Sequence, residues 1–393
     1  MQITICHPGT QHSAKLAEAL NEEGILGGLW TGLRFRSDSP VLKRFRISGN
    51  RVIPQSIAPR THQLRAQEIA GMLLQKLGLP GESTIRWRNG WFQSSVPRQA
   101  ITSCNGVVGF DTSSWLLARR AKQLGKPFLL DRTTIHRTSR IQIRRQLLSV
   151  SAGQRSSDPL LTDVQGRLET EEMELAARVI VASEFARDSL IPFGVPGAKI
   201  VVIPYGVDSS RFAQRKENRE SKPVFLYVGN LTAEKGVHVL LAAWKELQSQ
   251  TAELWFAGPA NPEIIETARG IPGVRLLGKL DPERLLAAYQ AASAFVFPTL
   301  YDGFGLVLLE AMACGLPVIA TPSCAAPELI GDNSAGSLCT AGSTAELAAA
   351  MADVISNPRA WALRGIAARE IAQGYSWQAY GSRWATLLRE VIN

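Results

Sequence analysis

The stretch FPTLYDGFGLVLLEAMACGLPVIAT, residues 297–321, decides the fold class of this 393-residue chain. An apolar strand ends at Pro298, a loop with two glycines follows, and a helix leads through Gly315 and Pro317 into a second apolar strand. A strand, a loop, a helix and a strand in this order are typical of a parallel sheet covered by helices. Ligands of such sheets bind in the loops at the carboxyl ends of the strands. The loop 299–305 is therefore the first candidate for a binding site.

The same alternation fills the rest of the chain and predicts an α/β protein of two domains with a cleft between them. We expect an N-terminal Rossmann-like domain over residues 1–205, a C-terminal one over 206–375, and a C-terminal helix over 376–393 that crosses back to the first domain. The boundary follows from IPYGVD (203–208), where a proline and a glycine interrupt the pattern before a polar stretch. The predicted strands are Gln2–Cys6, Val107–Phe110, Pro127–Asp131, Val179–Ala182, Ile200–Pro204, Val224–Val228, Glu253–Ala257, Val274–Leu277, Phe295–Pro298 and Pro317–Ala320.

The loop 299–305 and the helix after it have the composition of a site for an anion and a sugar. Gly303 and Gly305 let the backbone approach a ligand closely, and the helix start presents its positive dipole end to a diphosphate. Asp302 precedes the helix and Glu310 lies on its second turn, so the carboxylates are separated by roughly 10 Å. That is too far for one metal ion, but it suits two acceptors for hydroxyls of two sugars joined by a diphosphate. Either acid alone would be an ordinary turn or surface residue; the combination favours a site.

A second loop, GNLTAEKG (229–236), also runs from a strand to a helix start. It offers small residues, backbone N–H donors and the cation Lys235, which are the groups that bind a phosphate. Many surface turns share this composition, so the loop gains weight only beside the first one.

These two loops resemble segments of a known family. The first is similar to the donor-site segment of the retaining glycosyltransferases of family 4 (glycosyl transferases group 1), and YVGNLTAEKGVHVLLAAW (227–244) resembles their diphosphate loop. The likeness is strong over residues 224–330 and looser over VIVASEFARDSL and KIVVIPYGVDSSRF. It implies the GT-B fold, in which two Rossmann-like domains face each other across a cleft. It also implies a nucleoside-diphosphate sugar as donor, retention of anomeric configuration, and neither a metal nor a further cofactor.

By position, the resemblance implies that Lys235 binds the donor diphosphate, that Asp302 with the following amides binds the sugar and phosphate, and that Glu310 binds the ribose. The loop at Gly278 corresponds to the place where the family's backbone meets the base. The expected donor-binding residues are Gly9, Thr10, Asn230, Lys235, Gly278, Lys279, Leu280, Asp302, Gly303, Phe304, Gly305, Leu306 and Glu310. Two positions depart from the family pattern. Asp302 stands where Glu is frequent, and Asn230 stands where many members have Arg, so one cation for the diphosphate is missing.

The first half contributes two loops that follow predicted strands. Gly9-Thr10-Gln11-His12 is expected to face the cleft, and DRTTIH (131–136) loosely resembles a histidine-bearing loop on the acceptor side of some relatives. We expect His136 to act beside Asp302 and Lys235 as the catalytic groups. A lone histidine after a strand is as readily structural, and that alternative stays open.

Charge is unevenly distributed in this chain of net charge +9: residues 1–205 hold 27 Lys and Arg against 16 Asp and Glu, and the remainder holds 16 against 18. The excess lies in Arg34–Arg51 and Arg132–Arg145. It predicts either a solvated basic face or a surface for anionic lipid or acidic glycan. Apolar side chains among the first group favour the membrane slightly: Trp30, Leu33, Phe35, Val41, Leu42, Phe45 and Ile47.

The compartment follows from what the sequence lacks. No signal peptide or apolar run long enough for a spanning helix is evident, so we expect a cytoplasmic protein with peripheral contact at the inner face of the membrane. The five cysteines are scattered without a Cys-x-x-Cys pair, so we expect buried thiols rather than disulfides or a zinc site.

Together these observations predict an enzyme, a hexosyltransferase that moves a sugar to a glycan or lipid-linked acceptor in polysaccharide or glycolipid biosynthesis. UDP and GDP are the favoured nucleotides of the donor, although no residue identifies the base or the sugar, and no nucleic acid partner is expected. Two alternatives remain open: a nucleotide-sugar epimerase or phosphorylase on the same architecture, and a carbohydrate- or lipid-binding scaffold that has lost catalysis.

Overall fold

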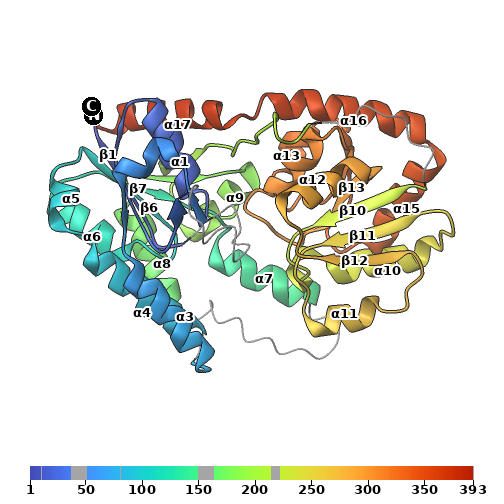
Figure 1. Cartoon of the computed structure of the whole chain (residues 1–393), viewed down its shortest axis with the longest axis horizontal. Coiled ribbons are helices and arrows are strands. Elements are labelled where there is room, and N and C mark those ends of the chain that lie inside the picture. The colour runs from blue at the N-terminus through green and yellow to red at the C-terminus, as the bar shows by residue number, and fades with distance from the viewer. Residues whose placement is uncertain (10, 37–50, 80, 149–162, 214–221, 393) are drawn as a thin grey trace.

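The computed structural model describes residues 1–9, 11–36, 51–79, 81–148, 163–213 and 222–392, and every structural statement below refers to these residues. Two separate sheets lie side by side, with the N-terminal sheet at the left and the C-terminal sheet at the right of Figure 1. The central strands β1 (Ile3–His7), β6 (Gly106–Phe110) and β10 (Val224–Val228) are buried along their whole length. Strands buried on both faces are characteristic of parallel sheets between two helical layers. The predicted two-domain α/β architecture is confirmed.

The N-terminal sheet has seven parallel strands in the order β5-β2-β1-β6-β7-β8-β9. Its other strands are β2 (Leu26–Thr31), β5 (Thr61–Gln63), β7 (Phe128–Asp131), β8 (Arg178–Val181) and β9 (Ile200–Val202), and the short β3 (Phe35–Arg36) and β4 (Val52–Ile53) pair separately. Its helices are α1 (Ser13–Glu22), η2 (Gln55–Arg60), α3 (Arg65–Lys76), α4 (Gly81–Ser95), α5 (Arg98–Thr102), α6 (Trp115–Gln123), α7 (Arg137–Leu148), α8 (Asp163–Leu175), α9 (Glu184–Asp188), η4 (Ile191–Phe193) and η5 (Gly197–Lys199).

The C-terminal sheet has six parallel strands in the order β12-β11-β10-β13-β14-β15. Its other strands are β11 (Glu253–Ala257), β12 (Val274–Gly278), β13 (Ala294–Phe297), β14 (Val318–Ala320) and β15 (Gly336–Leu338). The helices are η6 (Ala233–Lys235), α10 (Val237–Leu247), α11 (Pro262–Ala268), α12 (Pro282–Ala291), α13 (Leu306–Ala313), α14 (Ala326–Ile330), α15 (Thr344–Ser356), α16 (Pro358–Gln373) and α17 (Trp377–Ile392).

Every strand predicted from the sequence is present, with ends within two residues of the prediction. The sequence-based prediction missed β2, β3, β4, β5 and β15. Strand β2 reads LGGLWT, and its two glycines lower the intrinsic preference for a strand. Gly27 nevertheless fits there because a Cβ at that position would lie only 3.1 Å from the Ile3 carbonyl of the neighbouring strand. Strands β5 and β15 have three residues each, too few to give a periodic pattern.

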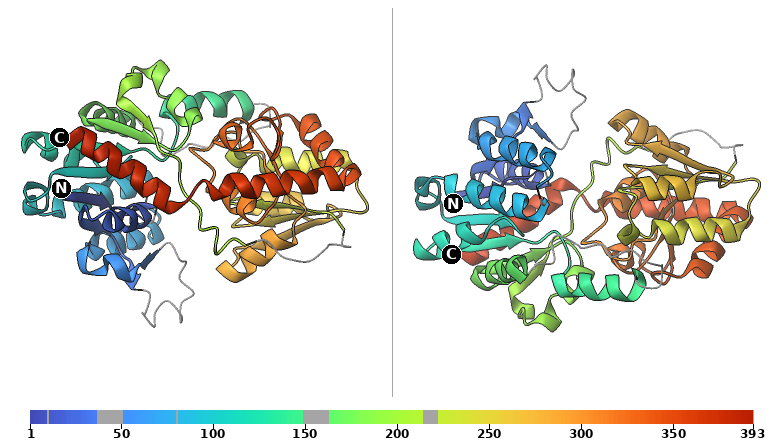
Figure 2. Two further views of the ribbon diagram at one scale, coloured as in Figure 1. Left: turned by 90° about the horizontal axis from the view of Figure 1, so that it is seen from above. Right: turned by 90° about the horizontal axis from the view of Figure 1, so that it is seen from below.

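The last two helices connect the domains, as Figure 2 shows from above and below. Helix α16 packs on α13 of the C-terminal domain, and α17 continues across to α1 of the N-terminal domain. Gly381 allows this approach, since a Cβ there would lie 2.6 Å from the Ala19 Cβ. The Ser382 hydroxyl donates to the Glu23 carboxylate at 2.8 Å. The chain therefore crosses between the domains once near residue 205 and again before α17.

Three cations of the two basic stretches are buried, so the prediction that these stretches form a basic surface is wrong for these three residues. Arg34, 2% exposed, donates to the Gly9 carbonyl at 3.1 Å, while Arg132 and Arg140 both face Glu169 in the interior. A charge inside a protein requires such partners, and composition cannot distinguish it from a surface charge. Seven residues of the first stretch, in which apolar and basic groups interleave, lie outside the described ranges: Val41, Leu42, Lys43, Arg44, Phe45, Arg46 and Ile47.

All five cysteines are free and buried, as expected. Within the described ranges, none of the helices has the length and apolar character needed to traverse a bilayer.

Candidate functional site

The residues singled out in the two loops of the C-terminal domain meet in the structure. Lys235 ends η6, and its Nζ donates to Asp302 Oδ2 at 2.6 Å. The two side chains keep 28% and 25% of their surface exposed, so the pair remains open to a ligand. Burial alone would lower the pKa of Lys235, but the Asp302 carboxylate outweighs it and raises the pKa. Lys235 is therefore a cation at neutral pH.

The backbone fixes the distance between these two loops. The Leu300 amide donates to the Glu234 carbonyl at 2.9 Å. Gly236 adopts a left-handed conformation (φ 69°), and a Cβ there would lie 1.9 Å from the Pro298 carbonyl oxygen. Only glycine combines that dihedral with that approach. The turn that carries Lys235 is thus seated directly on the end of β13.

Asp302 is preorganised from both sides. Its Oδ1 accepts from the Phe304 amide at 3.1 Å while its Oδ2 faces Lys235. Burial favours the protonated acid, but the Lys235 charge and the bonds from Lys235 and the Phe304 and Gly305 amides prevail and lower the pKa. From the sequence these amides were expected to bind the donor sugar and phosphate; in the structure they bond first to Asp302. In the first turn of α13, the Leu308 amide donates to the Gly305 carbonyl at 2.9 Å.

Glu310 lies on α13 with a partner that the sequence reading missed. The hydroxyl of Tyr289, a fully buried residue of α12, donates to Glu310 Oε2 at 2.9 Å. Burial raises the pKa of Glu310 above its ordinary value, and the bond from Tyr289 and the charge of Arg211 oppose this. No motif in the sequence marks Tyr289, because its register on α12 becomes meaningful only after the helix has packed.

The remaining donor-loop residues line the same edge of the sheet. The Gly258 amide donates to the Gly278 carbonyl at 2.8 Å, so the loops after β11 and β12 are joined. Lys279 is exposed and Leu280 half-buried beside them. Asn230 has an exposed side chain, and its carbonyl accepts from the Tyr227 hydroxyl at 2.9 Å. No cation replaces the expected arginine at that position of the loop.

The two domains approach each other closely at Gly303. A Cβ on Gly303 would lie 2.0 Å from the Thr133 carbonyl oxygen of the N-terminal domain. The Ser183 hydroxyl donates to the Gly303 carbonyl at 2.7 Å and accepts from the Ala186 amide, so it joins the cap of α9 to the donor loop. The sequence reading placed a glycine here for a ligand; the structure shows that it also admits the other domain.

Three loops of the N-terminal domain converge behind this contact. Thr133 donates through its hydroxyl to Asp111 Oδ1 at 3.0 Å, and Gln11 Nε2 lies 3.4 Å from the Thr133 hydroxyl. Gly9 lies in the loop after β1, where its carbonyl is bonded to Arg34. Thr10 falls outside the described residues. The carboxyl ends of β1, β6 and β7 therefore face the donor loop at Gly303.

The two histidines considered for this face, His12 and His136, both pack against other side chains. His12 keeps 7% of its side chain exposed: its Nε2 lies 2.7 Å from Asp131 Oδ2, and its ring centroid lies 4.3 Å from that of Tyr205. That His12 faces the cleft stays a prediction. His136 is half-buried, stacks on Phe193 with ring centroids 4.2 Å apart, and accepts from the Thr138 amide through Nδ1.

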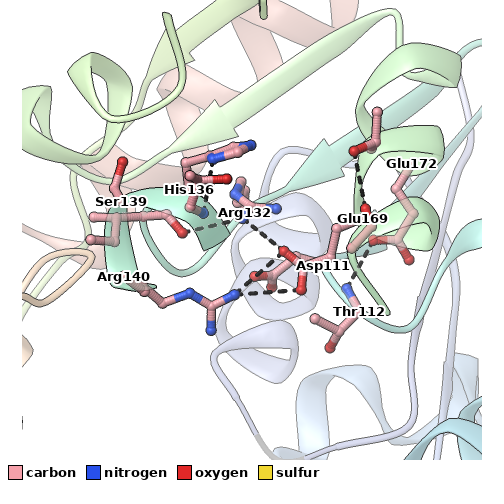
Figure 3. A network of polar contacts seen from close by, with 12 residues as sticks. Asp111, Thr112, Arg132, His136, Ser139, Arg140, Glu169 and Glu172 are labelled. Atoms are coloured by element: carbon pink, nitrogen blue, oxygen red, sulfur yellow. Dashed lines mark hydrogen bonds and ion pairs between the residues drawn. The ribbon is translucent and has the colours of Figure 1, made fainter. Parts of the chain in front are cut away.

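His136 borders a cavity of about 440 Å³ that is lined by residues 136–138 and 166–174. Burial and then the nearby Arg132 charge lower the pKa of His136 to about 4, so the ring is neutral at physiological pH. Figure 3 shows it above the buried charges of this region. None of the contacts described for His136 joins it to Lys235 or Asp302, although its loop reaches Gly303 through Thr133.

Figure 3 also shows the buried charges that hold the Thr133 loop in place. Arg132 donates to Glu169 Oε2 at 3.0 Å and to the Ile135 carbonyl at 3.2 Å. Glu172 accepts from the amides of Thr112 and Ser114, 2.8 and 2.6 Å away, at the start of α6. Breaking a buried ion pair leaves an uncompensated charge, so this network fixes the loop that presents Thr133.

A second ion pair crosses between the domains. Arg144 of α7 lies 2.9 Å from Glu234, the residue before Lys235. Among the described residues, no group of three or more histidine, cysteine or acidic side chains is arranged to bind a metal ion. The chemistry that the described site offers is therefore that of a cation, two carboxylates and helix-terminal amides.

Comparison with known proteins gives two matches to family models. A model of the family described as Glycosyltransferase Family 4 matches residues 96–211, and a model described as Glycosyl transferases group 1 matches residues 222–357. The second range contains both donor loops. The first contains Thr133 and His136.

Curated relatives are similar over part of their length. The glycogen synthase of Mycobacterium tuberculosis (strain ATCC 25618 / H37Rv) is 34% identical over 218 residues, which are 53% of this chain and 52% of that protein. The GDP-mannose-dependent alpha-(1-6)-phosphatidylinositol monomannoside mannosyltransferase of Mycolicibacterium smegmatis is 29% identical over 53% of this chain and 61% of its own. The chain thus spans 52% and 61% of the length of these two relatives.

Solved structures match the whole chain. Sucrose-phosphate synthase from Thermosynechococcus elongatus has a TM-score of 0.70 at 21% identity and covers 100% of this chain and 99% of its own. Anabaena HepE in complex with UDP-glucose has a TM-score of 0.69 at 17% identity over 99% and 100% of the two chains. The GT-B fold expected from the sequence is confirmed by these likenesses.

The contact at Gly303 can be tested by adding one methyl group. Gly303→Ala should lower the free energy of unfolding by about 1–3 kcal/mol, because the new Cβ meets the Thr133 carbonyl and one domain must retreat. Urea unfolding of the full chain measures this. Gly197→Ala is the matched control, since a Cβ at that exposed glycine meets nothing within 4 Å. Equal stability of the two variants would contradict the contact.

The domain interface should also respond to pH through Glu328 of α14, whose Oε1 accepts from the Glu184 amide of α9 at 2.8 Å. Burial raises the pKa of Glu328 from 4.5 to about 7, the amide bonds oppose this, and the Glu184 charge adds to it. A raised folded pKa means that the contribution is fully present below pH 4.5 and is lost as the pH rises through about 7.

Glu328→Gln removes this titration and keeps an oxygen acceptor. The variant should match the wild type at pH 4.5 and exceed its stability at pH 8 by about 1 to 2 kcal/mol. Urea unfolding at both pH values measures the difference. Glu266→Gln, at a carboxylate that is 71% exposed, should show no such dependence on pH. A stability gap that is the same at both pH values for Glu328→Gln rejects the linkage.

Proposed function

This chain belongs to the glycosyl transferases group 1 of glycosyltransferase family 4, and on that premise we propose that it moves a hexose from a nucleoside-diphosphate sugar to a glycan or lipid-linked acceptor. The observation that carries the proposal is the 2.6 Å pair of Lys235 and Asp302 at the carboxyl edge of the C-terminal sheet. The pair combines a permanent cation with a carboxylate of lowered pKa on the two loops that the family uses for its donor.

The cation of this pair suits the diphosphate of the donor, and the carboxylate suits its sugar hydroxyls. A diphosphate would approach Lys235 and the first-turn amides of α13, which are the groups that bind anions in proteins. The sugar would then replace part of the Lys235 contact and donate its hydroxyls to Asp302. Since Asp302 is already held by the Phe304 amide at 3.1 Å, it needs little reorganisation to accept them. Preorganised groups of this kind stabilise charge that develops during the reaction.

Glu310 would bind the ribose. It lies two turns into α13, away from Asp302, and the Tyr289 hydroxyl fixes one of its oxygens while the other stays available as an acceptor. The pKa of Glu310 is raised, so protonation would weaken ribose binding, because the carboxylate form is the better acceptor for two hydroxyls. The loops at Gly278 to Leu280 and at Asn230 would border the base and the diphosphate. With Asn230 in place of an arginine, Lys235 is the cation of its loop.

We propose a retaining mechanism without a protein nucleophile. Lys235 and the first-turn amides of α13 stabilise the departing diphosphate, and one of its oxygens takes the acceptor proton on the face where the acceptor attacks. The acceptor would lie against the N-terminal loops at Gln11, Thr133 and His136. His136, neutral at physiological pH, could bind an acceptor hydroxyl but does not supply a positive charge.

The proposal for the acceptor draws on two relatives of the chain. Among the relatives, the name of the mycobacterial mannosyltransferase specifies a phosphatidylinositol monomannoside, whereas that of the glycogen synthase specifies glycogen, a polysaccharide. We propose a lipid-linked or otherwise anionic acceptor, with a soluble glycan as the alternative. UDP and GDP are the proposed nucleotides of the donor, and HepE, of the same fold, was solved with UDP-glucose.

The second candidate is a scaffold on this fold that binds a carbohydrate or lipid without turnover. Asn230 is the observation that favours it, since one expected cation is absent. The ion pair and Glu310 favour the enzyme. An epimerase would need proton-transfer groups around the donor sugar. The described groups closest to that position, Asp302 and Lys235, are already paired with each other.

A thermal-shift screen of UDP, GDP and ADP and their common sugar conjugates tests the donor site. A ligand at about 100 times its dissociation constant should add roughly 2.7 kcal/mol of stability. We expect one nucleotide family to stabilise the wild type and Glu310→Ala to lose most of the shift. Tyr289→Phe, which leaves Glu310 in place without its hydroxyl donor, should retain a reduced shift. The absence of a shift with every nucleotide would remove the proposed donor site.

A further inference from the structure

The helical hairpin of α3 and α4 projects from the N-terminal domain at the lower left of Figure 1. The first helix of the hairpin, α3, directs its apolar side outward instead of into the domain. Ile69, Met72, Leu73 and Leu77 recur at helical spacing on one side, and all four are exposed, Leu73 by 56% and Leu77 by 77%. A helix on a water-soluble surface normally buries such a stripe.

The inward side of α3 is polar instead. Gln67 and Glu68 are 5% exposed, and Gly71 is also buried. Gln67 Nε2 donates to the Ser95 hydroxyl at 2.9 Å, and Glu68 forms an ion pair with Arg51 at 2.7 Å. Hydrogen bonds and an ion pair therefore attach this helix to the domain, and its apolar stripe has no partner within the described chain.

Helix α4 adds two exposed aromatic side chains to the hairpin. Trp87 and Trp91, one turn apart, are 46% and 39% exposed, with ring centroids 5.2 Å from each other. The inner side of α4 is mixed, because Phe92, and Val96 directly after the helix, are buried in the core beside polar residues. Asn89 donates to the Thr112 carbonyl at 2.9 Å, and Gln93 accepts from the Leu116 amide at 2.7 Å. Six large apolar side chains on two adjacent helices are too many to be scattered surface residues.

The charge of the hairpin indicates what covers this face. Residues 65–98 carry five cations, Arg65, Lys76, Arg86, Arg88 and Arg98, against two acids, Glu68 and Glu82. Glu68 is neutralised by Arg51, so the balance outside that pair is positive. Tryptophan and basic side chains around a stripe of aliphatic residues are the composition of a helix that lies in the interface of an anionic bilayer.

We propose that the α3–α4 hairpin docks this chain on an anionic lipid bilayer, with Ile69, Met72, Leu73, Leu77, Trp87 and Trp91 inserted among the headgroups. The inference goes beyond the transfer reaction, since donor binding by the C-terminal domain does not require a membrane. It also differs from the basic stretches predicted from the sequence, because Arg34, Arg132 and Arg140 of those stretches are buried.

Flotation of the full chain with vesicles tests the proposal. We expect binding to vesicles of equal parts phosphatidylglycerol and phosphatidylcholine at low salt, and at least roughly tenfold weaker binding to phosphatidylcholine alone. The combined variant Leu73→Ser, Leu77→Ser, Trp91→Ser should bind the anionic vesicles at least roughly tenfold less. The matched control is Leu363→Ser with Ile366→Ser on α16, which are 67% and 51% exposed and should float like the wild type.

Three results would overturn the proposal. They are no flotation of the wild type with anionic vesicles, equal flotation of the triple variant, and a dimer in gel filtration that the triple variant converts to a monomer without any vesicle binding. The last would assign the face to a second copy of the chain. The nucleotide thermal shift should be the same in the wild type and the triple variant. Flotation without any nucleotide shift would remove the proposed function alone, and a shift without flotation would remove the docking surface alone.

Discussion

The arrangement of this molecule depends on the lack of space for a side chain at Gly303. A Cβ there would lie 2.0 Å from the Thr133 carbonyl oxygen. Because Gly303 has no Cβ, loop 299–305 of the C-terminal domain and loop 131–136 of the N-terminal domain meet there through their backbones. Ser183 locks the contact from the other side through its 2.7 Å bond to the Gly303 carbonyl. Asp302, one residue earlier, is therefore placed by both domains.

The positions of Lys235 and Asp302 determine their charge states. Lys235 and Asp302 lie on adjacent loops of one sheet edge, so each shifts the other's pKa toward its charged form, despite burial that acts against both. On the opposite side of the contact, Arg132 and Glu169 form a buried pair that holds the Thr133 loop. The two halves of the proposed reaction thus rest on charge pairs of different kinds. One is partly exposed and can exchange its partner for a ligand, and the other is closed and structural.

Much of this could be predicted from the sequence, and the failures have physical reasons. The ten predicted strands and the proposed donor residues Lys235, Asp302 and Glu310 carry local signals: apolar runs, glycines and charges in short loops. Strand β2 carries two glycines, and no local signal reveals it. Tyr289 and Ser183 act across the fold, so only packing identifies them. Arg34 and Arg132 looked like surface charge because burial depends on partners distant in the chain, and the outward apolar side of α3 became evident only once exposure was known.

The central claim is that the Lys235 and Asp302 site transfers a sugar rather than merely binding one. Release of free nucleotide from the stabilising UDP- or GDP-sugar, without added acceptor, tests it most directly, with the wild type beside Lys235→Met. We expect slow release by the wild type and a loss of about 100-fold in the variant, since Lys235 stabilises the leaving diphosphate. A donor that binds the wild type with no release of nucleotide above the level of Lys235→Met would contradict the account and leave a binding scaffold on this fold.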